Sequence, residues 1–442
     1  MRIRLQEHFS YGKLLRFTLP SIAMMVFTSV YGVVDGLFVS NYVGKTPFAA
    51  VNLIFPLIMI LGAFGFMIGT GGTAIVARVL GEGESKKGNE YFSLLIYFTL
   101  GCGAAVSALG LLALRPVAGL LGAEREMLDC CIRYGRIILA ANPFFMLQNV
   151  YQSFFVAAEK PKLGLWITVA AGVTNMVLDW LFIAVLGWGL EGAALATSAS
   201  QIVGGLIPTL YFARENDSLL RLGAARWHGG VVVRTCVNGS SELMSSVSSS
   251  LVTVLYNFQL MRFAGEDGVA AYGVVMYVAF FFAAVFIGYA VGCAPVISWH
   301  FGARNTHELK SLLGKSLRLV GGAGCAMTAL AWLLATPLST LFVGYDPTLC
   351  AMTVRGFRIF AFSFLMSGLN IFGSSFFTAL NDGAVSAAIS FLRTLVFQAA
   401  FILALPALWQ LDGVWISSVA AEVAAIAVTA LFLAAKRSKY QY

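Results

Sequence analysis

The stretch that decides the fold lies near the amino terminus and reads LPSIAMMVFTSVYGVVDGLFVSNYVG at residues 19–44. Its only charged residue is Asp35. As a helix that rises about 1.5 Å per residue, this run is long enough to cross the roughly 30 Å hydrocarbon core of a bilayer. An acid inside such a run is costly in lipid, which makes Asp35 a candidate functional residue.

The rest of the chain has a similar composition. Of its 442 residues, 59% are hydrophobic and only 11% are charged, and the mean hydropathy is +0.82. Soluble domains carry charge on about a quarter of their positions. The remaining polar residues are too few for an attached ATPase, kinase or DNA-binding domain. The sequence therefore predicts an all-α polytopic membrane protein.

Charge-free runs separated by turn-like breaks predict twelve transmembrane helices. Their approximate bounds are 15–40, 49–77, 92–114, 137–158, 163–187, 192–213, 231–261, 268–299, 319–343, 359–381, 383–411 and 413–435.

Lys and Arg residues are distributed unevenly over the two sides that these helices define. Of the 29, 20 fall on the side of the termini, 8 fall on the other side and Arg393 falls inside a span. Loops rich in Lys and Arg stay in the cytoplasm. We therefore expect both termini in the cytoplasm and a multi-pass protein of a prokaryotic plasma or inner membrane. The net charge of +8 is then explained by basic residues in cytoplasmic loops, and it does not indicate a nucleic-acid partner.

The sequence repeats itself at an offset of 221 residues. YVGKTPFAAVNL (42–53) aligns with FAGEDGVAAYGV (263–274), and LEGAALATSASQ (190–201) aligns with LDGVWISSVAAE (411–422). Six helices repeated in the same orientation predict two lobes related by a pseudo-two-fold axis along the membrane normal. We expect an N-terminal lobe at 1–213, a cytoplasmic linker at 214–230 and a C-terminal lobe at 231–442.

Polar residues inside the first lobe form a candidate ion site. Asp35 and Asp179 interrupt apolar runs, and Asn175 lies one helical turn before Asp179. Counted from the cytoplasmic ends of their helices, both acids reach the outer half of the bilayer. Burial and mutual repulsion would favour a proton on the pair. Pro20, earlier in the first helix, is expected to bend or hinge it.

The second lobe carries a different polar set. Glu242, Arg393 and Glu422 all reach the bilayer midplane by the same rise arithmetic. Arg393 can form a structural ion pair that offsets the burial of Glu242 or Glu422. Alternatively, the three residues can bind substrate or couple transport to an ion, and the sequence leaves both interpretations open. Eight hydroxyl residues near Glu242 suggest a helix face that lines water. The candidates for substrate binding or cavity lining are Tyr31, Asn149, Thr197, Gln201, Glu242, Asn370, Arg393 and Glu422.

Several segments together resemble the multidrug and toxic compound extrusion (MATE) family, nearer its DinF-like than its NorM-like branch. They are residues 19–44, GTGGTAIVARVLGEGE at 69–84, NMVLDWLFI at 175–183 and GLEGAALAT at 189–197. The resemblance covers nearly the whole chain. It implies a V-shaped exporter of twelve helices that exchanges protons or sodium ions for organic, often cationic, amphiphiles, with no cofactor besides the coupling ion.

The resemblance also implies roles for individual residues. Asp35, Asn175 and Asp179 match the family's first-lobe cation-coupling cluster, where sodium could bind, and Pro20 matches its bending proline. The second lobe departs from the NorM-like pattern, because LMSGLNIFGSSFF (365–377) has Asn370 but no acid. We therefore expect no second-lobe sodium site.

Two other classes of function fit the sequence less well. An enzyme finds little support, since the chain has neither GxxxxGK[ST] nor HExxH. A flippase for a lipid-linked precursor is the stronger alternative, but it should present several cations to pyrophosphate, and Arg393 is the only basic residue within a span. The expected partners are small organic substrates, the coupling cation and the bilayer, with no nucleic acid and a monomeric chain.

Overall fold

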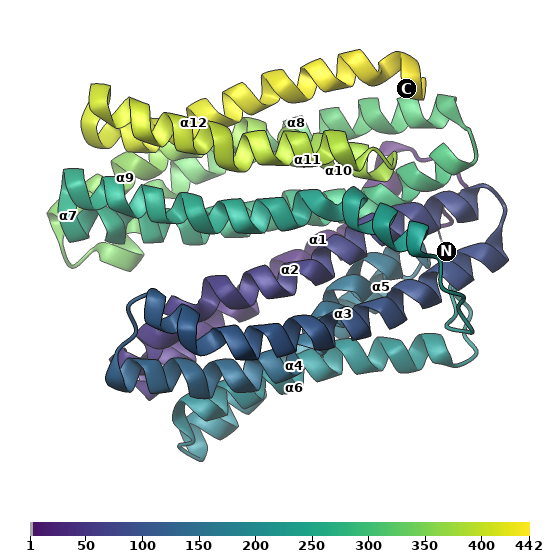
Figure 1. Cartoon of the computed structure of the whole chain (residues 1–442). Helices are drawn as coiled ribbons and strands as arrows, with labels where there is room; N and C mark the ends of the chain where they lie inside the picture. The colour runs from purple at the N-terminus through teal and green to yellow at the C-terminus, as the bar shows by residue number, and fades with distance from the viewer. Residues whose placement is uncertain (1–2) are drawn as a thin grey trace.

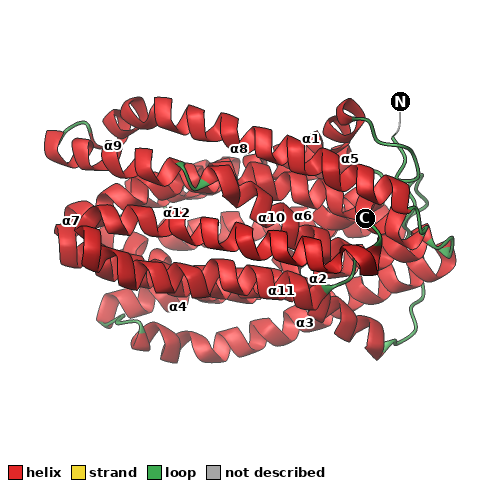
Figure 2. Ribbon diagram, turned by 90° about the horizontal axis from the view of Figure 1, so that it is seen from above, coloured by secondary structure: helices red, strands yellow, loops and turns green. Residues whose placement is uncertain are grey.

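A computed structural model describes residues 3–442, except for the side chains of Leu37, Ser40, Asn41 and Lys45. Residues 1–2, including Arg2, and the side chain of Lys45 therefore lie outside the described residues, although both cations were counted in the charge asymmetry. All regular secondary structure in the described part is helical, as Figure 2 shows.

The first half of the chain forms six helices, two of which continue as short π-helices. Their bounds are α1 (Tyr11–Phe38) with η1 (Val39–Val43), α2 (Lys45–Gly81), α3 (Ser85–Leu120), α4 (Arg125–Ala157), α5 (Pro161–Asp179) with η2 (Trp180–Val185), and α6 (Gly189–Ala213).

The second half is also helical, with two long elements that contain breaks. Its helices are α7 (Gly229–Gly302), α8 (Thr306–Val343), α9 (Pro347–Ala361), α10 (Phe364–Ala379), α11 (Gly383–Phe391) with η3 (Leu392–Phe397), and α12 (Gln398–Tyr440). α7 is interrupted at Gly265, where φ is 64°, and α12 at Trp409 and Gln410, where φ of Gln410 is 50°.

Eleven of the twelve predicted runs lie, within a few residues, on a helical segment once α7 and α12 are divided at their breaks. The run 359–381 instead crosses the break between α9 and α10, and most of α9 lies outside the predicted runs. Among the described residues, eight helices are long and apolar enough to cross a membrane, or nine if α9 and α10, bent by 47°, form one span. α4 is not among the eight, and the buried amides of Gln148, Asn149 and Gln152 lower its hydropathy. The all-α polytopic prediction is confirmed.

Several observed helices are longer than the predicted runs. α8 begins at Thr306, where residue 319 was expected, and α4 begins at Arg125, where 137 was expected. The apolar run marks only the part of a helix that lies in hydrocarbon, and the backbone stays helical beyond it. Caps define the true ends: the Asn305 side chain accepts a hydrogen bond from the Glu308 N–H before α8.

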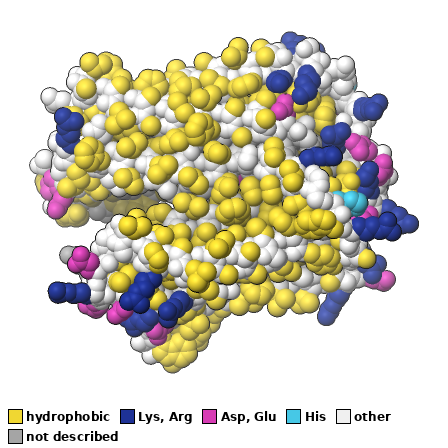
Figure 3. Space-filling model, in the orientation of Figure 1, with side chains coloured by type: hydrophobic (Ala, Val, Ile, Leu, Met, Phe, Trp, Pro, Cys, Tyr) yellow, Lys and Arg dark blue, Asp and Glu magenta, His cyan; other side chains and the backbone are white. Residues whose placement is uncertain are grey.

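The two halves lie side by side and are separated at one end. Figure 1 shows α1–α6 below and α7–α12 above, with both termini at the right. Figure 3 shows a hollow between the halves at the opposite end. α6 ends at Ala213 and α7 begins at Gly229, so the described chain has no helix at 214–228.

Glycines bring α2 and α7 into backbone contact across the two halves. A Cβ atom on Gly239 would lie 1.9 Å from the Met67 carbonyl oxygen, and one on Gly71 would lie 2.2 Å from the Thr235 carbonyl oxygen. Neither position has room for a side chain. The glycine-rich segment 62–72 therefore packs closely against α7 at Gly71.

The segment before α1 contacts both halves at the end where the termini lie. The Leu5 N–H donates to Glu159 Oε1 at 2.8 Å, in the turn between α4 and α5. The Phe9 N–H donates to Glu308 Oε1 at 3.0 Å, and His8 Nδ1 lies 2.6 Å from Glu308 Oε2, in the first turn of α8. These contacts add to the glycine contacts in holding this end closed.

Candidate functional site

Three helices of the first half bring the predicted polar cluster together. Asp35 lies near the end of α1, Asn175 and Asp179 lie in the last two turns of α5, and Thr197 lies in α6. Thr197 Oγ1 donates to Asp35 Oδ1 at 3.5 Å, and Asn175 Nδ2 donates to Thr197 Oγ1 at 3.4 Å. Asp35 and Asp179 therefore meet although 144 residues of sequence separate them.

The two acids face each other in a nearly donor-free environment. Their carboxyl groups are close enough to share a hydrogen bond when one of them carries a proton. Asp179 is completely buried, and neither of its carboxylate oxygens has a hydrogen-bond donor among the described residues. A buried carboxylate without a donor is unfavourable, and the repulsion of the neighbouring Asp35 carboxylate makes it more so. The arrangement therefore favours a proton or a bound cation between Asp35 and Asp179.

The backbone changes its helical form beside both acids. α5 ends at Asp179 and continues as η2, and α1 changes to η1 four residues after Asp35. Short π-helices are rare and occur frequently at functional sites, because the wider turn redirects side chains. Hydropathy and charge patterns carry no signal for them, so the sequence did not predict them.

A tyrosine that the sequence did not single out lies near the acid pair. Tyr134 of α4 is buried and close enough to interact electrostatically with both Asp35 and Asp179. Its phenolic O–H is a hydrogen-bond donor of the kind that Asp179 lacks. The hydropathy and charge patterns of the sequence carry no signal that places Tyr134 near the acids.

The other first-half candidates lie around the same interior. Tyr31, one turn before Asp35, lies near Gln148 of α4. Asn149 and Gln201 are buried, and Asn149 Nδ2 and Gln201 Oε1 lack hydrogen-bond partners among the described residues. Unsatisfied buried amides are suited to a polar ligand or water.

In the second half, Arg393 pairs with Glu422. Arg393 Nε donates to the two Glu422 carboxylate oxygens at 2.9 and 3.0 Å, and Arg393 Nη2 lies 2.8 Å from Oε1. Asn370 Nδ2 donates to Glu422 Oε2 at 2.7 Å, and Thr429 Oγ1 donates to Asn370 Oδ1 at 3.0 Å. The network joins α10, η3 and α12. Its fully paired carboxylate fits the structural role better than a coupling role.

Glu242 lies apart from this network. Its carboxyl group forms no ion pair or hydrogen bond with the described residues, and its side chain is only partly buried. The hydroxyls of Ser246 and Ser250 donate to carbonyl oxygens one turn earlier in α7. Glu242, Arg393 and Glu422, which were predicted to share a depth, therefore form one ion pair and one separate acid. Equal depth in the bilayer does not bring side chains to the same face of the bundle.

Pro20 is buried inside α1, which stays helical through it. The predicted hinge is therefore not an open break in this structure, and the hinging role stays a prediction.

The Arg393 network gives a testable expectation for stability. Arg393→Ala should lower the free energy of unfolding by about 3 kcal/mol, because it leaves the Glu422 carboxylate buried without its cation. Glu422→Gln in the same chain should recover part of that loss. Thermal unfolding of both single variants and the double variant measures the coupling. Additive effects would show that Arg393 and Glu422 do not depend on each other.

The chain was compared with known proteins. A family model, MatE, matches residues 20–181 and 243–403, well over half of the chain and one block in each half. The chain belongs to the MatE family. It is thus a multi-pass membrane protein of a family of multidrug efflux transporters and not an enzyme, as the sequence predicted.

Several relatives and solved structures resemble this MatE chain along its whole length. It is 23% identical to the multidrug export protein MepA of Staphylococcus haemolyticus, over 94% of this chain and 92% of that protein. It is 22% identical to MepA of Staphylococcus aureus over the same shares. The crystal structure of a MATE protein in complex with MaL6 and the outward-facing structure of a multidrug resistance MATE transporter each match with a TM-score of 0.93, 23% identity and coverage of 99% and 98%.

Proposed function

We propose that this MatE chain is an antiporter that exports small organic compounds, often cationic and amphiphilic, in exchange for protons or sodium ions. The observation that carries the proposal is the Asp35–Asp179 pair, whose second member is completely buried without a donor. The MepA relatives are named multidrug export proteins, which supports the substrate class.

The ion site consists of oxygen atoms from three helices. The carboxylates of Asp35 and Asp179, the unpartnered Asn175 Oδ1 and Thr197 Oγ1 are the atoms available to an ion. Hard cations prefer oxygen ligands of this kind, and a proton shared by the two carboxylates would relieve the same repulsion. Either ion would load where the acids face the outer side and leave where they face the cytoplasm.

Alternating access fits the distribution of contacts between the halves. The hollow in Figure 3 lies at one end, and the Gly71 and Gly239 contacts and the segment before α1 close the other. Rocking the lobes at 1–213 and 231–442, with 214–230 as their linker, would exchange the open end for the closed one. We propose that one chain is sufficient for this cycle.

The proposed antiporter is tested in proteoliposomes that contain the purified chain and an organic cation dye. A pH gradient and a sodium gradient are imposed in separate experiments, and dye efflux is followed. We expect dye efflux under at least one gradient, and the gradient that drives efflux identifies the coupling ion. Efflux that depends on neither gradient would remove the antiporter proposal.

We propose further that both termini lie in the cytoplasm of a plasma-membrane protein, because Lys and Arg are concentrated at that end. In a chain without its seven native cysteines, an impermeant maleimide applied to intact cells should modify Asp267→Cys and spare Ser438→Cys. Both positions are exposed, at opposite ends of the bundle. The reverse labelling pattern would invert the topology.

A further inference from the structure

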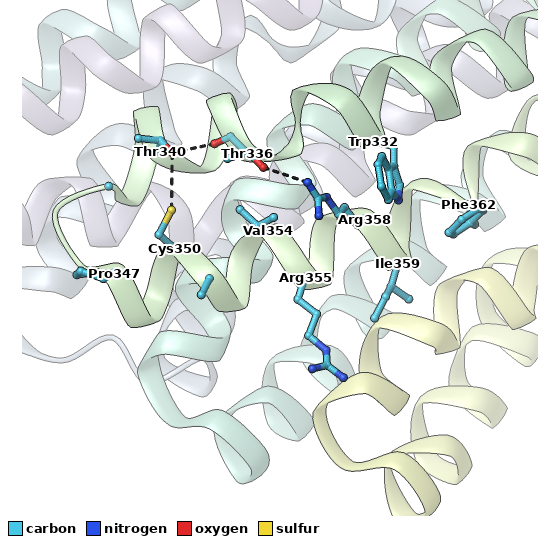
Figure 4. Close-up of a pocket in the computed structure, with 12 residues that line it drawn as sticks. Trp332, Thr336, Thr340, Pro347, Cys350, Val354, Arg355, Arg358, Ile359 and Phe362 are labelled. Carbon is cyan, nitrogen blue, oxygen red and sulfur yellow. Dashed lines mark hydrogen bonds between the residues drawn. The ribbon is translucent and has the colours of Figure 1, made fainter.

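A groove separates α8 from α9 at the end of the bundle opposite the termini. It encloses about 820 Å³. Figure 2 places α8 and α9 at an outer edge of the bundle. All residues that line the groove belong to α8, α9 or the residues next to them, so the first half contributes none of its walls. Trp332, Thr336 and Thr340 of α8 form one wall, and Val354, Arg358 and Ile359 of α9 form the other (Figure 4).

Arg358 lies in this groove without a counter-charge. Its guanidinium carbon is 4.5 Å from the centre of the Trp332 ring, and its Nη2 donates to Thr336 Oγ1 at 3.2 Å. Its Nε is buried without a hydrogen-bond partner, and the described residues place no carboxylate within ion-pair distance of it. The hydroxyl and the ring hold the cation in place but do not neutralise it.

Arg355, one turn before Arg358 in α9, differs in that it is paired with a carboxylate. Arg355 Nε donates to Asp412 Oδ1 at 2.9 Å and Nη2 to Oδ2 at 2.5 Å. Figure 4 shows Arg355 pointing away from Arg358, toward the α12 side. Arg358 is thus the groove's available cation, among the described residues that line it.

The position of the groove matches a lipid headgroup region. α8 has 38 residues, about 57 Å of helix, which exceeds the roughly 30 Å hydrocarbon core. Trp332 lies about 16 Å before the end of α8, a depth at which the indole ring is common near the membrane interface. Leu333 and Leu341 of the same helix are 70% and 77% exposed, which is suited to contact with acyl chains.

We propose that the groove between α8 and α9 binds one anionic phospholipid, with its phosphate on Arg358 and an acyl chain along Val354 and Ile359. The charge of Arg358 selects the anionic headgroup, because an uncompensated cation at the interface is stabilised by a phosphate. The volume and the apolar wall hold the chain. The site lies in the leaflet on the side opposite the termini.

Native mass spectrometry of the detergent-purified full chain tests this assignment. The chain is titrated with phosphatidylglycerol, with phosphatidylcholine of the same acyl chains, and with inorganic phosphate as a competitor. We expect one phosphatidylglycerol bound at the lowest lipid concentrations, with weaker binding of phosphatidylcholine. Arg358→Gln should weaken the phosphatidylglycerol complex about fivefold, the change expected for one interfacial cation.

Two further variants separate the groove from general effects. Arg358→Lys keeps the charge but loses the planar stacking on Trp332, so it should bind phosphatidylglycerol more tightly than Arg358→Gln and less tightly than the unmodified chain. Arg262→Gln removes an exposed arginine that contacts the Phe263 ring at the same end but does not line this groove, and it should leave the lipid ratio unchanged. A misfolded variant would lose both lipids, so the ratio of phosphatidylglycerol to phosphatidylcholine is the readout.

Three results would overturn the proposal. They are equal binding of both lipids by the unmodified chain, an unchanged lipid ratio in Arg358→Gln, and displacement of phosphatidylglycerol by millimolar inorganic phosphate. The last would identify a site for free phosphate.

Discussion

Replacing Asp35 with Asn should reduce gradient-driven export to the level of empty vesicles while the protein remains folded. The amide imitates a carboxyl group that never releases its proton, so the Asp35–Asp179 pair can no longer alternate between its loaded and empty states. Asp179→Asn should have nearly the same effect. Dye efflux from proteoliposomes, at matched amounts of protein, measures both variants.

The control for this experiment is an acid outside the cluster. Asp267→Asn changes an exposed residue beside the break in α7 and should leave efflux unchanged. Glu422→Gln should affect stability more than transport, because Glu422 is paired with Arg393. Full gradient-driven efflux in Asp35→Asn would mean that the first-lobe acids do not couple export to the ion.

Gly239→Ala should destabilise the conformation described here and open the end that the termini occupy. Its methyl group would lie 1.9 Å from the Met67 carbonyl oxygen, so α2 and α7 would have to separate. Overpacking of this kind costs about 1–3 kcal/mol in cores, and backbone atoms cannot rotate away as a side chain can. Thermal unfolding should therefore shift downward.

A distance measurement separates opening from general damage. Spin labels at Lys86 of α3 and His307 of α8, both exposed near the termini, should move apart in Gly239→Ala. Gly322→Ala is the matched control, because a Cβ atom there meets nothing within 4 Å on an exposed position of α8. It should be neutral or slightly stabilising. An unchanged label distance and unfolding temperature in Gly239→Ala would contradict the closed-end contact.

The local pattern of hydropathy and charge was sufficient to predict that the chain is a membrane protein and where its helical segments lie. A run such as 19–44 has to be helical in lipid, because every backbone N–H and C=O needs a partner there. Rise per residue also placed Asp35 and Asp179 at compatible depths, and the structure brings them together. The sequence determined these features because each depends on one segment and its solvent.

Contacts between distant segments were decided by the tertiary structure alone. Depth could not distinguish Glu242 from Glu422 as the partner of Arg393, because the rotation of each helix about its axis is set by packing with its neighbours. Tyr134 beside the acids, the π-helices η1 to η3, and the Gly239 contact with Met67 also depend on how helices meet. Arg358 has no counter-charge among the described residues because α9 packs against α12 so that Asp412 reaches Arg355 instead. A linear pattern gives each residue a depth and a polarity, whereas neighbours across helices arise only from the packed bundle.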